Sequence, residues 1–254
     1  MILTKYFQQF FHNSKSSGIV LIVCVLISLL VANSSLSADF QSLLDSKLGT
    51  DIFHLNYSVS VWINDGLMAI FFLLVGLEIK RELLEGELSD IKKASLPIFG
   101  AVGGMLIPAL IYLAFNYNSE YKNGWAIPMA TDIAFSFAII SLLGKSVPAS
   151  LKIFLSALAI VDDLGAILVI ALFYTAQIDW LSLGICGVIL GLLIILNKSG
   201  TKNLIFYLIP GLFLWYFMHH SGIHATIAGV ILAFTIPTNI SETEPSPLEK
   251  LEQK

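Results

Sequence analysis

Charged residues are scarce in this sequence. Asp, Glu, Lys and Arg make up 13% of the 254 residues, about half of the roughly 25% that soluble domains carry. Apolar residues account for 56%, and the mean hydropathy is +0.83, which excludes a water-soluble globular protein. The sequence also lacks an excess of positive charge, because 14 Lys and Arg residues stand against 18 Asp and Glu. We therefore expect no nucleic-acid partner, since binding a phosphate backbone requires a basic surface.

Cysteine is almost absent as well. Cys24 and Cys186 each lie within a long apolar run, so they provide neither a disulfide framework nor a thiolate metal site. The sequence contains no His-Cys cluster that would favour a soft metal ion. We expect the protein to carry no cofactor.

Long apolar runs are what the sequence has in abundance. Eight of them approach the ~20 residues that a helix needs to cross a ~30 Å hydrocarbon core. They are residues 18–32, 58–79, 94–115, 125–143, 150–174, 181–196, 204–217 and 223–236. Because lipid cannot bond backbone polar groups, and the pattern does not fit barrel hairpins, these runs are predicted to be helices. The predicted fold is an all-α membrane protein with about eight transmembrane helices in a domain at 18–237, between polar cytoplasmic tails at 1–17 and 238–254.

The distribution of basic residues predicts the orientation of these spans. With eight spans, twelve of the 14 Lys and Arg residues fall on one side of the membrane, and only Lys47 and Lys122 fall on the other. Basic residues favour the cytoplasmic side. An even number of spans with both chain ends in the cytoplasm is therefore predicted.

Four acidic residues lie inside the predicted spans rather than at their ends, and each charge at the bilayer centre costs roughly 2.5 to 3.5 kcal/mol. They are Asp65, Asp132, Asp162 and Asp163. Because only protonation, a cation, internal water or a helix end relieves this cost, each of them needs a partner. Adjacent residues on a helix point about 100° apart, so Asp162 and Asp163 cannot face one ligand in the same way. Two close carboxylates also resist joint ionisation, and such a pair can exchange a proton for a metal cation.

The fourth span contains a helix breaker. Pro128 stands four residues before Asp132, and proline removes a backbone hydrogen bond and kinks or breaks a helix. We predict an interrupted helix around Ala130–Asp132 that presents backbone carbonyls at membrane depth. Together with the Thr131 hydroxyl and the carboxylates of Asp132 and Asp163, these oxygens form the ligand set that a hard cation such as Na⁺ prefers.

Other ionisable residues have simpler interpretations. Asp65 lies near one end of its span, where water or a helix terminus can satisfy its carboxylate. His219 and His220 are expected to lie in an outer turn and to face water. His224 opens the last apolar run. Histidine changes charge near neutral pH, so His224 is either a pH-sensitive residue or an ordinary interfacial histidine.

A group of charged residues follows the second span. Glu78, Arg81 and Glu82 have the spacing i, i+3 and i+4, which places them on one face of a helix. This spacing fits ordinary interfacial ion pairs, and it also fits a charge cluster that responds to cytoplasmic pH.

Four stretches of the chain have distinctive sequences. They read GLEIKRELLEG at 76–86, GWAIPMATDIAF at 124–135, LKIFLSALAIVDDLGAI at 151–167 and GIHAT at 222–226. These stretches resemble signatures of the NhaA family of bacterial sodium/proton antiporters. The resemblance extends from near the start of the chain to about residue 237.

The resemblance implies roles for individual residues. Asp163 would be the main carrier of the cation and the proton, and Asp162 its essential neighbour. Asp132 and Thr131 would form the interrupted-helix part of the same site. The residues that would belong to the pH response are Glu78, Arg81, Glu82, His224 and Glu252.

The resemblance also implies a function. It predicts a secondary active transporter that exports Na⁺ or Li⁺ in exchange for external H⁺ and so regulates pH and sodium. The expected location is the bacterial inner membrane, where the multi-pass chain would be surrounded by lipid and form a homodimer through residues 33–57.

Family members carry about twelve spans, so this chain is expected to lack the family's last spans. Those spans would contain the second interrupted helix and a lysine that pairs with the residue matching Asp162. Two alternatives to an antiporter are therefore kept. One is a truncated membrane module that does not transport. The other is an intramembrane aspartyl protease, although the Tyr-Asp and Gly-x-Gly-Asp motifs of such enzymes are absent around Asp132 and Asp162.

Overall fold

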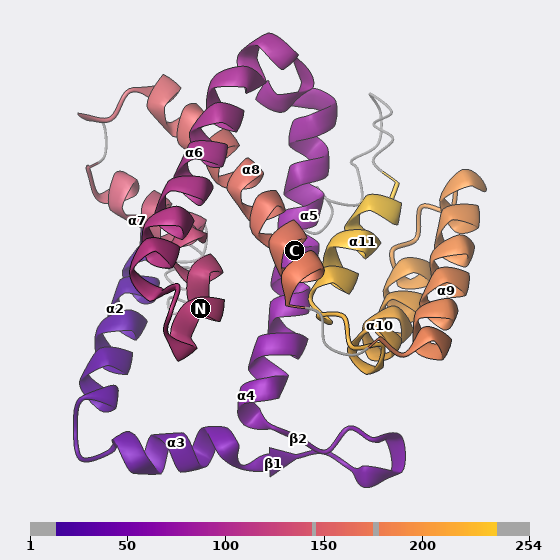
Figure 1. Ribbon diagram of the computed structural model, residues 1–254. Coiled ribbons are helices and arrows are strands. Elements are labelled where there is room, and N and C mark those ends of the chain that lie inside the picture. Colours follow the sequence, from indigo (N-terminus) through magenta and orange to yellow (C-terminus); the bar gives the residue numbers. More distant parts are fainter. Residues whose placement is uncertain (1–13, 144–145, 175–177, 238–254) are drawn as a thin grey trace, which may run out of the picture. The chain divides into compact units, whose positions relative to one another are not determined.

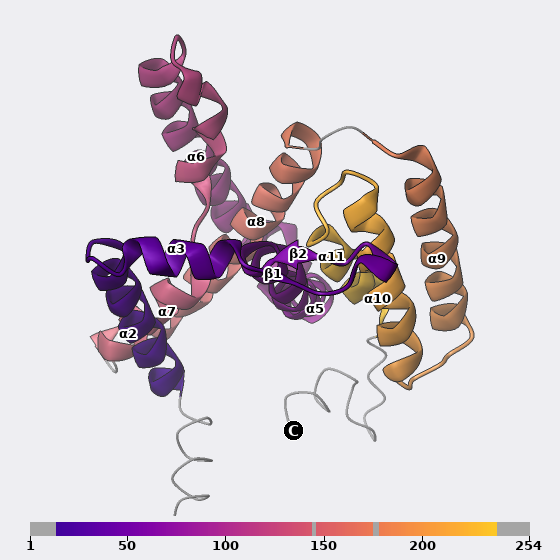
Figure 2. The same ribbon diagram turned by 90° about the horizontal axis from the view of Figure 1, so that it is seen from below.

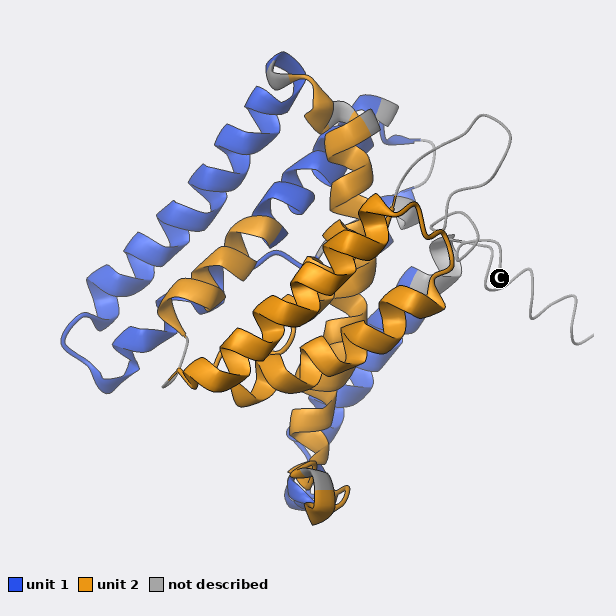
Figure 3. Ribbon diagram, turned by 90° about the vertical axis from the view of Figure 1, so that its right-hand side faces the viewer, with its two compact units in different colours: residues 1–46, 92–163 blue, residues 47–91, 164–254 orange. Residues whose placement is uncertain are grey.

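The computed structural model describes residues 14–143, 146–174 and 178–237. These residues form helices and one two-stranded antiparallel sheet (Figure 1). The chain divides into two compact units (Figure 3). Unit 1 contains the described residues of 1–46 and 92–163, and unit 2 contains those of 47–91 and 164–254. The predicted tails lie largely outside the described residues.

Unit 1 is built from helices. They are α2 (Ser14–Ala32), α3 (Ser37–Asp45), α6 (Ile91–Asn116), the 3-10 helix η4 (Glu120–Met129), α7 (Ile133–Leu143) and the first part of α8 (Ala149–Phe173). The axis turns by 108° between α2 and α3, as Figure 2 shows. Helix α2 packs on α7. The two backbones come close at Gly18, because a side chain there would meet Ala138.

Unit 2 begins with a hairpin and continues with helices. Its elements are β1 (Lys47–Leu48), η1 (Asp51–Phe53), β2 (Tyr57–Ser58), α4 (Val59–Val61), the π-helix η2 (Trp62–Leu67), α5 (Met68–Glu85), η3 (Glu87–Ser89), the end of α8, α9 (Trp180–Lys198), α10 (Ile205–His220) and α11 (Ile227–Thr235). The core lies among α5, α9, α10 and α11, where Leu77, Leu193, Tyr207 and Leu214 are fully buried.

The end of α11 is held by two polar side chains. The Lys80 ammonium donates to the carbonyl oxygens of Phe234 at 2.9 Å and Ile236 at 2.5 Å. The Asn197 amide donates to the Thr235 carbonyl at 2.8 Å. The last carbonyls of a helix have no partner within the helix, and a cation beside them also complements the helix dipole. These bonds therefore fix α11 to α5 and α9.

The predicted spans correspond to helices, but the count of eight is not confirmed. In the described part of the chain, four helical stretches are long and apolar enough to cross a membrane: 59–84, 92–116, 150–173 and 180–198. The bent pair of α2 and α3 would raise this number to five. Helices α10 and α11 are shorter, with 16 and 9 residues. The turn at 221–226 that separates them contains apolar residues as well as glycine. The apolar stretches of the sequence are therefore longer than the helices.

Residues 33–57 form ordered structure that the sequence did not specify. Helix α3 is followed by the hairpin, in which Lys47 pairs with Ser58 and Leu48 pairs with Tyr57. The indole nitrogen of Trp62 donates to the Leu48 carbonyl at 2.9 Å. This bond ties the hairpin to the helix that follows it.

Close packing of α5 against α11 generates a prediction at Gly229. An added Cβ there would collide with the Ala69 carbonyl oxygen and lie 2.9 Å from the Leu73 nitrogen. Both obstacles are backbone atoms, so the helices must separate. We expect Gly229→Ala to destabilise the protein by about 1–3 kcal/mol, measured by thermal unfolding in detergent micelles.

Gly187→Ala is the matched control, because a Cβ on Gly187 of α9 meets no atom within 4 Å. Replacing a helical glycine by alanine in open space is neutral or stabilising. Equal melting temperatures for the Gly229→Ala variant and the unchanged protein would contradict this description of the α5–α11 contact.

Candidate functional site

The helix break in unit 1 is present where the sequence predicts it. Residues 130–132 are not helical, and Ala130 is extended with φ −74° and ψ 133°. The segment before the break, η4, is a 3-10 helix that contains Pro128, and α7 starts afresh at Ile133. The interruption frees backbone carbonyls in the segment that carries Thr131 and Asp132. Polar backbone of this kind is tolerated in a membrane only where protein or water lines it.

Asp132 has a structural role at this break. Its Oδ1 accepts a hydrogen bond of 2.9 Å from the backbone N–H of Phe135, and its carbonyl oxygen accepts bonds from the backbone and hydroxyl of Ser136. This is the geometry of a helix N-cap, in which a side-chain oxygen satisfies one of the free N–H groups of the first turn. Asp132 therefore fixes the start of α7 and keeps Oδ2 for another ligand.

Asp162 and Asp163 lie in the second half of α8. Asp162 is 3% exposed, and the Thr131 side chain lies close enough to interact with its carboxylate. Its Oδ1 is buried. Among the buried side-chain nitrogen and oxygen atoms of the described residues, it is the one without a hydrogen-bond partner. A buried acceptor without a partner is costly. This atom therefore favours an added proton or a cation.

The four predicted site residues come together in unit 1. The Asp163 carboxyl is partly buried and lies close enough to those of Asp162 and Asp132 for their charges to interact. Thr131 connects the break to Asp162. Like charges at short range in a low dielectric repel strongly. The arrangement therefore favours partial protonation or a bound cation.

The donor set fits a weakly held hard cation better than a metal cage. Within the described residues, no three His, Cys, Asp or Glu side chains are placed to hold a metal ion together. A Na⁺ ion would instead combine one or two carboxylates with the Thr131 hydroxyl and carbonyl oxygens of the break. Such a site suits an ion that must leave again.

The predicted pH-response residues of α5 form an ordinary ion pair. Arg81 Nη2 lies 2.5 Å from Glu78 Oε1, and both side chains are about two-fifths exposed. Glu82 lies on the next turn and is half-buried. These residues belong to unit 2, whereas the carboxylate group belongs to unit 1. Glu252 lies outside the described residues.

The predicted histidines are placed differently from one another. His224 is exposed in the turn before α11, where its carbonyl accepts the backbone N–H of Ile227. His219 and His220 are the last residues of α10, which extends three residues beyond the predicted end because no helix breaker precedes Ser221. The expectation that both face only water is wrong. His219 Nδ1 lies 3.0 Å from Asp65 Oδ2, and His220 Nδ1 lies 2.9 Å from the Tyr216 carbonyl.

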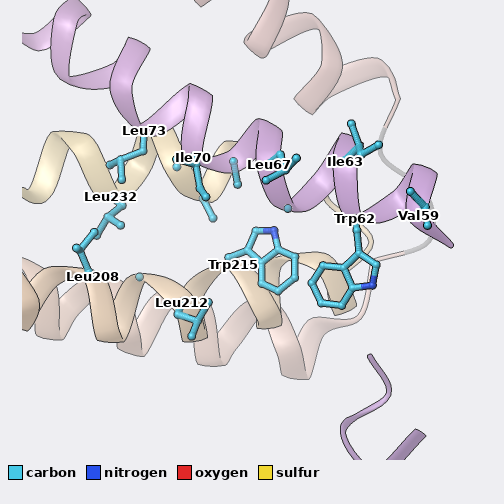
Figure 4. Close-up of a pocket in the computed structure, with 15 residues that line it drawn as sticks. Val59, Trp62, Ile63, Leu67, Ile70, Leu73, Leu208, Leu212, Trp215 and Leu232 are labelled. Atoms are coloured by element: carbon cyan, nitrogen blue, oxygen red, sulfur yellow. The ribbon is translucent and has the colours of Figure 1, made fainter. Parts of the chain in front are cut away.

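A large apolar cleft in unit 2 is separate from the carboxylates. It has a volume of about 520 Å³ and is lined by side chains of α4, η2, α5, α10 and α11, of which Figure 4 shows Leu67, Ile70, Leu208 and Leu212. The indole rings of Trp62 and Trp215, which also line it, lie side by side. Among the described residues that line this cleft, none is acidic.

Comparison with known proteins links this geometry to a family. A family model described as Na+/H+ antiporter 1 matches residues 8–254. The chain is 58% identical to Na(+)/H(+) antiporter NhaA 2 of Flavobacterium johnsoniae, over 99% of this chain and 62% of that protein. It is 57% identical to Na(+)/H(+) antiporter NhaA of Pelagibacter ubique, over 98% of this chain and 65% of that protein. The chain thus spans less than two thirds of the length of these relatives.

The N-cap at Asp132 generates a prediction that distinguishes its hydrogen bond to α7 from its negative charge. Asp132→Ala removes the acceptor for Phe135, and loss of an N-cap costs roughly 0.5–2 kcal/mol. Asp132→Asn removes the charge but keeps an acceptor. We expect hydrogen exchange in the first turn of α7 to rise in Asp132→Ala and to stay near the wild-type rate in Asp132→Asn. Equal protection in all three proteins would show that the side chain does not cap α7.

Proposed function

The chain belongs to the Na+/H+ antiporter 1 family, and from this membership we propose that it exchanges Na⁺ for H⁺ across a membrane. The family is one of transporters, which gives no support to a protease acting through Asp132 and Asp162. Na⁺ and H⁺ would be the substrates, and the exchange would be secondary active transport in which one ion gradient drives the other. The proposal rests on 93–99% coverage of this chain by relatives named as such antiporters.

We propose that the exchange takes place at the carboxylates of unit 1. The observation that carries this is the meeting of Asp132, Asp162 and Asp163 at a broken helix, with a buried acceptor on Asp162 that lacks a partner. A proton on Asp163 removes the repulsion from its neighbours, and so does a Na⁺ ion held by Asp163, Asp132 and Thr131. The two ligands relieve the same cost, so binding of one favours release of the other.

The finer features follow from the resemblance. Na⁺ or Li⁺ would leave the cell while external protons enter, through alternating access of the site to the two sides. The chain would lie in the bacterial inner membrane, with eight spans and both ends in the cytoplasm. Residues 33–57, which contain α3 and the hairpin, would form a homodimer contact.

Regulation by pH would involve charged residues outside this group. They are Glu78, Arg81, Glu82, His224 and Glu252. The ion pair of Arg81 with Glu78 would change when cytoplasmic pH alters the charge of the surrounding carboxylates. These residues would set the activity and would not carry the transported ions.

Removal of one carboxylate tests the proposed exchange. Asp163→Asn cannot release a proton or provide an anionic ligand at this position. The variant is expressed in antiporter-deficient cells, from which everted vesicles are prepared. We expect the sodium-dependent change in internal pH of these vesicles to be at least tenfold smaller than with the unchanged chain. The assay is the recovery of fluorescence of a pH-sensitive dye after addition of NaCl.

Glu120→Gln is the matched control, because Glu120 is an exposed acidic residue of unit 1 at the start of η4. It is expected to leave exchange unchanged, and immunoblots of the membranes would show equal amounts of each protein. Sodium-dependent pH change that persists in Asp163→Asn would overturn the assignment of Asp163. Its absence in the unchanged chain would overturn the proposed exchange.

A further inference from the structure

A second ionisable group lies in unit 2, at the hairpin end of the span formed by α4, η2 and α5. Asp65 projects from the π-helical turn η2, and its Oδ2 lies 3.0 Å from His219 Nδ1 at the end of α10. About one-fifth of each side chain is exposed. We propose that Asp65 and His219 form a proton-binding site that fastens this end of the span to α10.

Two features of the site favour a protonated imidazole. The Asp65 carboxylate accepts from Nδ1, and a hydrogen bond between two ionised groups is roughly twice as strong as a neutral one. His219 also lies in the last turn of α10, where the negative end of the helix dipole stabilises a cation. Both interactions weaken when the ring loses its proton, so the fastening depends on pH.

Aromatic rings surround the imidazole of His219. The Tyr57 ring lies edge-on at a centroid distance of 4.7 Å, and the Trp215 ring is stacked at 6.2 Å. Trp62 in turn stacks on Trp215 at 5.9 Å, as the pair of indoles in Figure 4 shows. The face of the stacked Trp215 indole attracts a nearby cation, which adds to the preference for the protonated ring.

The same rings connect three segments of unit 2. The indole nitrogen of Trp215 donates to the Asp65 carbonyl at 2.8 Å, and that of Trp62 donates to Leu48 in the hairpin. A change at His219 therefore acts on the hairpin, on the π-helical turn and on α10 together. Because π-helical turns are uncommon and less regular than α-helix, this turn is the element best able to rearrange.

The other titratable groups near His219 can be distinguished from it. Tyr57 of the hairpin has a pKa raised by burial and by the nearby Tyr216 and Asp65, so its hydroxyl stays protonated at neutral pH. His220 on α10 bonds to the Tyr216 carbonyl. Asp179, before α9, donates its backbone N–H to Ser221, and its carboxylate binds Ser182. His219 thus differs from these groups because its ring contacts both the Asp65 carboxylate and the Trp215 indole.

Tryptophan fluorescence reports directly on this site. A protonated imidazole quenches an indole stacked on it, and Trp215 is such a neighbour. The purified chain is reconstituted in lipid nanodiscs, with Trp125→Phe and Trp180→Phe so that the emission comes from Trp62 and Trp215. We expect emission to fall as the pH decreases from about 8 to about 5.5, with loss of this step in His219→Gln. Glutamine retains a hydrogen-bond donor for Asp65 but does not titrate.

His220→Gln is the matched control and is expected to retain the step. A second measurement is hydrogen exchange of the hairpin amides at 47–58, which should increase with pH beyond the intrinsic rate in the parent and lose this excess in Asp65→Asn. A fluorescence step that persists in His219→Gln, or one that disappears in His220→Gln alone, would overturn the proposal. So would a hairpin whose exchange is independent of Asp65.

Discussion

A carboxylate in a membrane interior needs a partner that stabilises its charge or a proton that removes it. This requirement explains the surroundings of the acidic residues in both units. Each unit contains a different solution. In unit 1 the groups that interact with Asp162 and Asp163 within the described part of the chain are carboxylates and the Thr131 side chain, so this arrangement suits a small cation or a proton. In unit 2 a histidine nitrogen lies 3.0 Å from the Asp65 carboxylate, and a proton on that ring would balance the charge within the protein. The same chemical constraint thus underlies both the proposed ion site in unit 1 and the proposed contact between helices in unit 2.

The broken helix in unit 1 allows the carboxylates and the Thr131 side chain to lie close together. A continuous helix would pair the carbonyls around Thr131 and would leave Asp132 on a regular surface. Because residues 130–132 are not helical, the Thr131 side chain lies beside Asp162 and the carboxylate of Asp132 caps the next helix. One local interruption caused by proline chemistry therefore organises two segments around one pair of carboxylates on α8.

The broken helix and the acidic residues beside it could be predicted from the sequence because their signals are local. Pro128 predicts the break four residues later, and acidic residues stand out against an apolar background. The pairing of Asp65 with His219 was missed because the two residues are 154 positions apart and the end of α10 was placed three residues too early. The expectation that water or a helix terminus satisfies Asp65 did not include His219 for the same reason. The short lengths of α10 and α11 were also not predictable from hydropathy, since the turn between them is itself partly apolar.

Infrared difference spectroscopy of the purified chain, with NaCl added at constant pH, directly tests whether Na⁺ and H⁺ compete for the carboxylates of unit 1. A protonated carboxyl group has a carbonyl absorption that an ionised carboxylate lacks. The account predicts that Na⁺ removes this absorption and that the sodium-induced difference is absent when Asp163 is replaced by asparagine. A carboxyl absorption that does not respond to Na⁺ would contradict competition between the two ions at this site.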